Sequence, residues 1–187
     1  MRGRRGVWLA IGAVLVAALV AALMIFEPWL LFVDDDVHEG DDPATVVGTA
    51  SGGLTDSAVP SATDGAPTRV VLASARFIDG EHGTTGKAVI YRRSDGSRFL
   101  RIEDLETSNG PDLHVWLTDR PSGGDCEGCR DSWGIYDDGA SVRLGPLKGN
   151  RGSQNYEIPA SADLAPMRSV VIWCDRFNVA FGTAAVG

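Results

Sequence analysis

The sequence predicts an all-β fold, a single β-sandwich or barrel-like domain behind one N-terminal transmembrane helix. Three observations predict it: a long uncharged apolar run near the N-terminus, an acidic stretch after it, and short strand-like runs between turn residues from residue 68 onward. Many short strands with regular turns are typical of a sandwich or barrel. A chain of 187 residues has room for one domain of ordinary size plus appendages.

The apolar run covers residues 7–26 and holds neither charge nor proline. A helix of about 20 apolar residues spans the hydrocarbon core of a bilayer. Three arginines precede the run and three aspartates follow it, so the positive-inside rule predicts a cytoplasmic N-terminus and an extracytoplasmic C-terminal part. Residues 1–33 are therefore expected to be a basic stub and an uncleaved signal anchor in the cell membrane. A cleaved signal peptide is the alternative, although its apolar region would be shorter.

Residues 34–67 contain eight acidic residues, no basic ones, and mostly small or polar residues otherwise. Such a composition buries too little apolar surface to order a chain, so this region is expected to be a disordered acidic linker. A calcium-binding tract is the alternative, but the loop spacing D-x-[DN]-x-[DN]-G is absent. The net charge of −8 argues against nucleic acid as a partner, because binding it needs a basic surface.

Residues 68–187 carry the strand pattern of the expected β domain. Strand-like runs occur at residues 69–77, 87–92, 98–105, 112–118 and 169–174. In the fourth run, Leu113, Val115 and Leu117 alternate with His114 and Trp116, which predicts one apolar and one mixed face. The last run is continuously apolar, as expected of a strand buried on both faces.

Two stretches go beyond general β patterning. One is SNGPDLHVWL at residues 108–117, and the other is LGPLKGNRGSQNYEIP at residues 144–159, continuing to residues 169–182. Together they resemble the DM-thirteen domain family, over roughly residues 70–185, and the anchor suggests a membrane-bound bacterial-type member. The resemblance implies a redox or electron-transfer domain of the cell envelope, with a redox partner in the membrane or envelope. It also implies that the family's characteristic cysteine is Cys174.

Cys174 has two interpretations. A reactive or ligating thiol needs access and nearby positive charge, which Arg168 or Arg176 could supply. The strand alternation instead places Cys174 with Val170 and Ile172 on a buried face, where a free cysteine acts as a small hydrophobic residue. Both interpretations stay open on sequence.

Cys126 and Cys129 form a C-x-x-C pair within a glycine-rich loop. In an oxidising compartment such a pair is expected to close a local disulfide. An exchange-active dithiol would need a helix in a β/α setting, and a zinc site would need two more ligands. No metal site is assigned.

His114 and Asp112 lie two apart on one expected strand and hence on one face, so they are a candidate cofactor-binding pair. The alternative is a half-exposed strand histidine beside an aspartate that serves the preceding turn. The cofactor is unknown, because neither a dinucleotide motif nor a C-x-x-C-H haem motif occurs.

The glycine-rich residues 145–152 carry Lys148 and Arg151, which with glycine backbone could hold an anion. The favoured interpretation is a structured connection held by the side chains of Asn150, Gln154 and Asn155.

The leading hypothesis is thus an envelope redox module with Cys174 as its reactive or ligating group. The second is a non-enzymatic binding or scaffolding domain in which this cysteine only packs. Whether the chain is an enzyme is left open.

Overall fold

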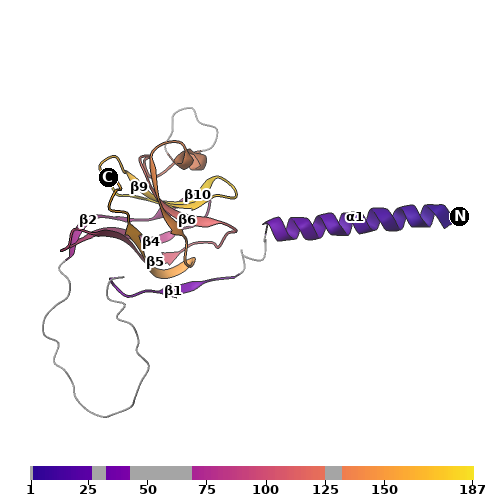
Figure 1. Cartoon of the computed structure of the whole chain (residues 1–187), viewed down its shortest axis with the longest axis horizontal. Helices are drawn as coiled ribbons and strands as arrows, with labels where there is room; N and C mark the ends of the chain where they lie inside the picture. The colour runs from indigo at the N-terminus through magenta and orange to yellow at the C-terminus, as the bar shows by residue number, and fades with distance from the viewer. Residues whose placement is uncertain (1, 27–32, 43–68, 125–131) are drawn as a thin grey trace, which may run out of the picture.

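The computed structural model describes residues 2–26, 33–42, 69–124 and 132–187 (Figure 1). After helix α1 (Arg2–Phe26), these residues form two five-stranded sheets. The first sheet has the order β1-β8-β5-β4-β2 and the second the order β3-β10-β9-β6-β7. The sheets face each other across one core, so the fold is the sandwich rather than the barrel of the two forms expected.

The strands of the first sheet are β1 (Asp36–His38), β8 (Arg151–Ile158), β5 (Arg98–Glu106), β4 (Thr85–Arg93) and β2 (Arg69–Arg76). Those of the second are β3 (Ile78–Asp79), β10 (Val179–Ala185), β9 (Ser169–Cys174), β6 (Leu113–Thr118) and β7 (Ser141–Pro146). Neighbouring strands are antiparallel except β1, which pairs parallel with β8. All five of the strand runs named above form, and β1, β3, β7, β8 and β10 complete the two sheets.

Within the described part of the chain, no helix has both the length and the apolar character that crossing a bilayer requires.

Strand β9 lies at the centre of the second sheet and is buried along its whole length, as its apolar run predicted. Val170, Ile172 and Cys174 face the main core between the sheets. Val171 and Trp173 face the other side, where they pack with Trp116, Tyr136 and Ala180 near the 3-10 helix η3 (Ser132–Asp137). A second apolar layer therefore covers the outer face of this sheet.

The expectation of a disordered linker from residue 34 is wrong for residues 34–42. This segment lies along β8, with Asp36 opposite Arg151 (Figure 1). Gly149 and Gly152 permit the approach, because a Cβ atom at either position would collide with the backbone of Asp35 or Val37.

The acidic side chains of this segment meet basic side chains of the sandwich. Glu39 pairs with Lys148 at 2.7 Å, and Asp34 pairs with Arg151 at 2.9 Å. Composition alone predicts that these carboxylates are exposed to solvent. It cannot show their basic partners, because those lie more than 100 residues further along the chain. The remaining linker residues, 43–67, fall outside the described residues.

Asp42 ends this segment in a buried ion pair. Its carboxylate accepts a hydrogen bond from Arg93 Nε at 2.9 Å, and the two side chains are only 4% and 7% exposed. Arg93 also donates to both carboxylate oxygens of Glu157, at 3.1 and 2.7 Å. These hydrogen bonds raise the pKa of Arg93, so it stays charged. The segment is therefore tied to both β4 and β8.

We expect Asp42→Ala to lower the free energy of unfolding by about 1–3 kcal/mol, because it leaves a buried guanidinium short of one acceptor. Asp41→Ala is the matched control. Its carboxylate is 79% exposed, so its pairs with Arg69 and Arg101 should contribute under about 1 kcal/mol. Urea unfolding of the full chain measures both, and equal losses in the two variants would contradict the docked arrangement of the segment.

Candidate functional site

The candidate site lies where β6 begins and β9 ends. Leu113 pairs with Cys174 and His114 pairs with Trp173 across the two strands. One step further, the N–H of Asp175 donates to the carbonyl of Asp112 at 3.0 Å. Since side chains alternate along a strand, this register turns Leu113 and Cys174 into the core and Asp112, His114 and Asp175 to the other face. The three site residues expected from sequence meet at one end of the sheet but not on one face.

Cys174 is a neutral buried thiol in this structure. It is the free cysteine among the described residues, it is 0% exposed, and it belongs to the main core. Burial raises the pKa of its thiol, and the nearby Asp112 carboxylate raises it further. Arg168 and Arg176, the expected sources of positive charge, are both exposed, and the charge that acts on the thiol is negative. The burial of Cys174 is confirmed, whereas its reactivity stays a prediction.

The turn after Cys174 partly offsets the effect of burial. The backbone N–H groups of Phe177 and Arg176 in this turn, and of Asp112 beside β6, act to lower the pKa of the thiol and so hold back its rise. Asn178 closes this turn with a left-handed φ of 51°, which asparagine tolerates better than most residues.

On the opposite face, His114 lies between two carboxylates. Its Nε2 atom is 3.0 Å from Asp112 Oδ1 and 3.5 Å from Asp175 Oδ2. The shared face of Asp112 and His114 is thus confirmed, and Asp175 is a third member that sequence reasoning missed. Its position directly after Cys174 gave no signal, because only the pairing of β9 with β6 brings it to His114.

The tryptophan pair of the outer layer adjoins this cluster. Trp173 Nε1 donates to Asp175 Oδ1 at 3.0 Å, and the rings of Trp173 and Trp116 have centroids 5.1 Å apart. The guanidinium of Arg143 lies 4.3 Å from the centre of the Trp116 ring and 3.8 Å from Asp175 Oδ2. Trp173 therefore connects the backbone beside Cys174 to the carboxylate of Asp175.

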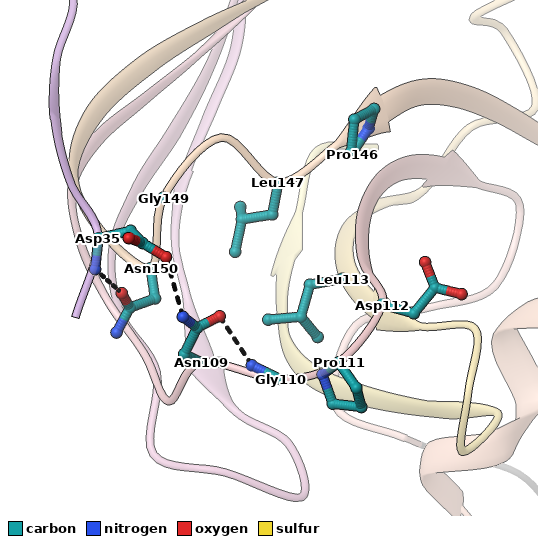
Figure 2. Close-up of a pocket in the computed structure, with 10 residues that line it drawn as sticks. All are labelled: Asp35, Asn109, Gly110, Pro111, Asp112, Leu113, Pro146, Leu147, Gly149 and Asn150. Atoms are coloured by element: carbon teal, nitrogen blue, oxygen red, sulfur yellow. Dashed lines mark hydrogen bonds between the residues drawn. The ribbon is translucent and has the colours of Figure 1, made fainter. Parts of the chain in front are cut away.

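A cavity of about 200 Å³ opens beside the start of β6 (Figure 2). Figure 2 shows Leu113 and Leu147 pointing into it and the Asp112 carboxylate pointing away. Asp35 and Asn109 form its polar edge, joined by a hydrogen bond of 3.0 Å. Drug-sized ligands occupy roughly 300–1,000 Å³. The cavity is therefore too small for a haem or flavin.

A larger cavity, about 370 Å³, flanks the other side of Cys174. Its lining includes Phe177, Val179, Phe181 and His82, and Val179 is the strand partner of Cys174 on β10. The His82 ring packs at a tilt against Phe181, with centroids 3.9 Å apart, and burial lowers the pKa of His82, so the imidazole is neutral at neutral pH. In the sequence, His82 lies in a glycine-rich turn, and nothing local shows that this turn packs on β10.

The sequence also predicted a disulfide between Cys126 and Cys129. Cys126 and Cys129 lie outside the described residues, so their disulfide stays a prediction.

The connection before β8 is held by buried amides as expected: Asn150 donates to the Thr107 carbonyl at 2.9 Å and Gln154 to the Gly149 carbonyl at 2.8 Å. Lys148 and Arg151 serve carboxylates of the chain's own N-terminal segment rather than a free anion.

Comparison with known proteins adds a family. A family model described as "Electron transfer DM13" matches residues 76–186, from the end of β2 through β10. No curated protein and no solved structure matches the chain.

We expect the Cys174 thiol to react with an alkylating reagent only after denaturation, because its side chain is fully buried. Intact mass of the full chain before and after denaturation measures this, with peptide mapping to assign the thiol. A chain in which Cys126 and Cys129 are both replaced by serine is the control that isolates Cys174. Native labelling at the rate of an unfolded cysteine would show that the thiol is accessible.

We also expect stability to fall at alkaline pH through Cys174. Its folded pKa is raised above the ordinary 9.0, so the unfolded chain loses this proton first and ionisation favours unfolding. The stability is complete below the ordinary value and falls above it, by at most about 1.4 kcal/mol per pH unit. Urea unfolding across this range should show a steeper decline for the native chain than for Cys174→Ala. Burial also raises the pKa of Tyr156, but both proteins share that effect.

Proposed function

The chain belongs to the DM13 electron-transfer family, and we propose from this that its sandwich is an electron-transfer module of the cell envelope. The family match carries the proposal, since it extends over nearly the whole sandwich. Cys174 lies at the centre in this proposal, because it is the free thiol among the described residues and nearby backbone N–H groups hold back the rise in its pKa.

The cavity beside Val179 is the place that we propose for a redox group, because its lining residue Val179 is the strand partner of Cys174. At about 370 Å³ it lies within the usual range for small-molecule sites, and its wall combines two aromatic rings with a neutral imidazole. Val179 and Phe177 separate this cavity from the thiol of Cys174, as strand partner and as turn residue. Phe177 and Phe181 would hold an apolar or planar group, while His82 offers the cavity a neutral ring nitrogen.

The proposal includes presentation outside the membrane by a sequence anchor at residues 7–26, with the lipid bilayer and an envelope redox protein as partners. The uncharged run at residues 7–26 and the charge difference across it support this part. Because residues 33–42 fold onto the sandwich, only residues 27–32 separate the helix from the domain. The domain would therefore lie close to the bilayer surface, within reach of a membrane-bound partner.

A second candidate function is a binding or scaffolding domain with a structural cysteine. The complete burial of Cys174 among core side chains favours it, because buried cysteines are usually inert. The two candidates differ in whether the thiol has any role beyond packing.

Voltammetry of the purified full chain, with any bound group retained, tests the proposal. We expect a reversible redox couple that Cys174→Ser abolishes while the circular dichroism spectrum stays native. A redox couple that survives in Cys174→Ser would show that the Cys174 thiol is not the redox or ligating group. A native chain without any couple would contradict electron transfer and favour the binding domain.

A further inference from the structure

We propose that Asp112, His114 and Asp175 form a binding site for a divalent transition-metal ion. One ligand atom from each residue lies within 4.8 Å of the other two, and the three side chains come from the facing ends of β6 and β9. The proposal concerns metal binding alone, and it stands whether or not the domain carries electrons.

The spacing of the ligand atoms fits an ion. Nitrogen and carboxylate ligands bind Zn²⁺ at about 2.0–2.2 Å, which in a tetrahedron separates the ligand atoms by about 3.3 Å. The distances from His114 Nε2 to the two carboxylate oxygens, 3.0 and 3.5 Å, lie on either side of this value. The ligand atoms of the two carboxylates lie within 4.8 Å of each other, so all three atoms surround one position.

An ordinary histidine–aspartate hydrogen bond explains only half of this arrangement. The Nε2 atom carries at most one hydrogen, so it can serve one carboxylate well, and Asp112 at 3.0 Å is the nearer. Asp175 Oδ2 then faces the same nitrogen at 3.5 Å, with Arg143 beyond it at 3.8 Å. A cation between the three groups satisfies both carboxylates and the nitrogen lone pair at once.

The surroundings hold the ligands in place in the way that metal sites require. Trp173 Nε1 donates to Asp175 Oδ1, which leaves Oδ2 directed at His114. The backbone hydrogen bond from Asp175 to the Asp112 carbonyl places the two residues side by side. Ligating carboxylates are commonly oriented by such second hydrogen bonds.

The ligand set indicates the class of ion. One imidazole and two carboxylates suit first-row divalent metals such as Mn²⁺, Zn²⁺ or Cu²⁺, with affinity rising toward Cu²⁺. The side chains of His114, Asp112 and Asp175 are 26%, 45% and 25% exposed, so solvent completes the coordination. Arg143 would compete with the metal ion, because its guanidinium pairs with the Asp175 carboxylate when no ion is bound.

The test is calorimetric titration of the metal-stripped full chain with Zn²⁺, together with electron paramagnetic resonance of the Cu²⁺ form. We expect one ion per chain at this site and a copper spectrum with coupling to one imidazole nitrogen. His114→Ala and Asp175→Asn should each weaken binding by more than about tenfold. Arg143→Gln should tighten it, because the competing cation is gone.

His38→Ala and Asp163→Asn are the matched controls, since both residues are exposed and lie outside the cluster. Binding that these controls reduce as much as His114→Ala does would overturn the proposal, as would binding that no variant at the cluster changes. Titration without any bound ion overturns it directly. The voltammetry of the native chain and of Cys174→Ser does not depend on these results, so the two proposals can fail separately.

Discussion

The register between β6 and β9 is the constraint on which both faces of the candidate site depend. Leu113 lies opposite Cys174, and the next backbone pair joins Asp112 to Asp175. Because side chains alternate, a slip by one residue would turn the thiol toward solvent and a carboxylate into the core. The burial of a carboxylate without a partner costs far more than the burial of a thiol saves. The central position of β9, packed on both faces, therefore determines which side chains face the core and which face outward.

Sequence pattern predicts those parts of the site that depend on a single strand. The alternation from Leu113 to Leu117 predicts that His114 and Asp112 share a face, and the apolar run before Cys174 predicts that the thiol is buried. Asp175 and His82 could not be found in this way, because each acquires its role from a partner on another strand. Strand β8 was missed for a related reason: its Gln154 and Asn155 look exposed in sequence, yet they are buried hydrogen-bonding groups.

The N-terminal segment shows the limit of composition as a guide to order. Residues 34–42 are acidic and poor in apolar side chains, so no local property predicts a docked strand. Their partners are Lys148 and Arg151 on the connection into β8, and Arg93 on β4. Counting formal charge in the segment and in the sandwich separately therefore misses their pairing. Much of the acidic charge of the segment is matched by basic side chains of the sandwich. The folded unit begins ahead of the residues that the family model matches.

The two faces of the site differ in the physical conditions that they offer. Inside, the Cys174 thiol is buried and neutral, and its strand partner Val179 lines the neighbouring cavity. Outside, the side chains of His114, Asp112 and Asp175 are partly exposed to solvent. Trp173 adjoins both, since it precedes Cys174 in the chain and hydrogen-bonds Asp175. A change of charge at the outer cluster would therefore change the pKa of the thiol through Asp112, whose carboxylate already raises the pKa of Cys174. Neutralising that carboxylate removes one of the two influences that keep the thiol protonated, which couples the faces electrostatically without any movement of the strands.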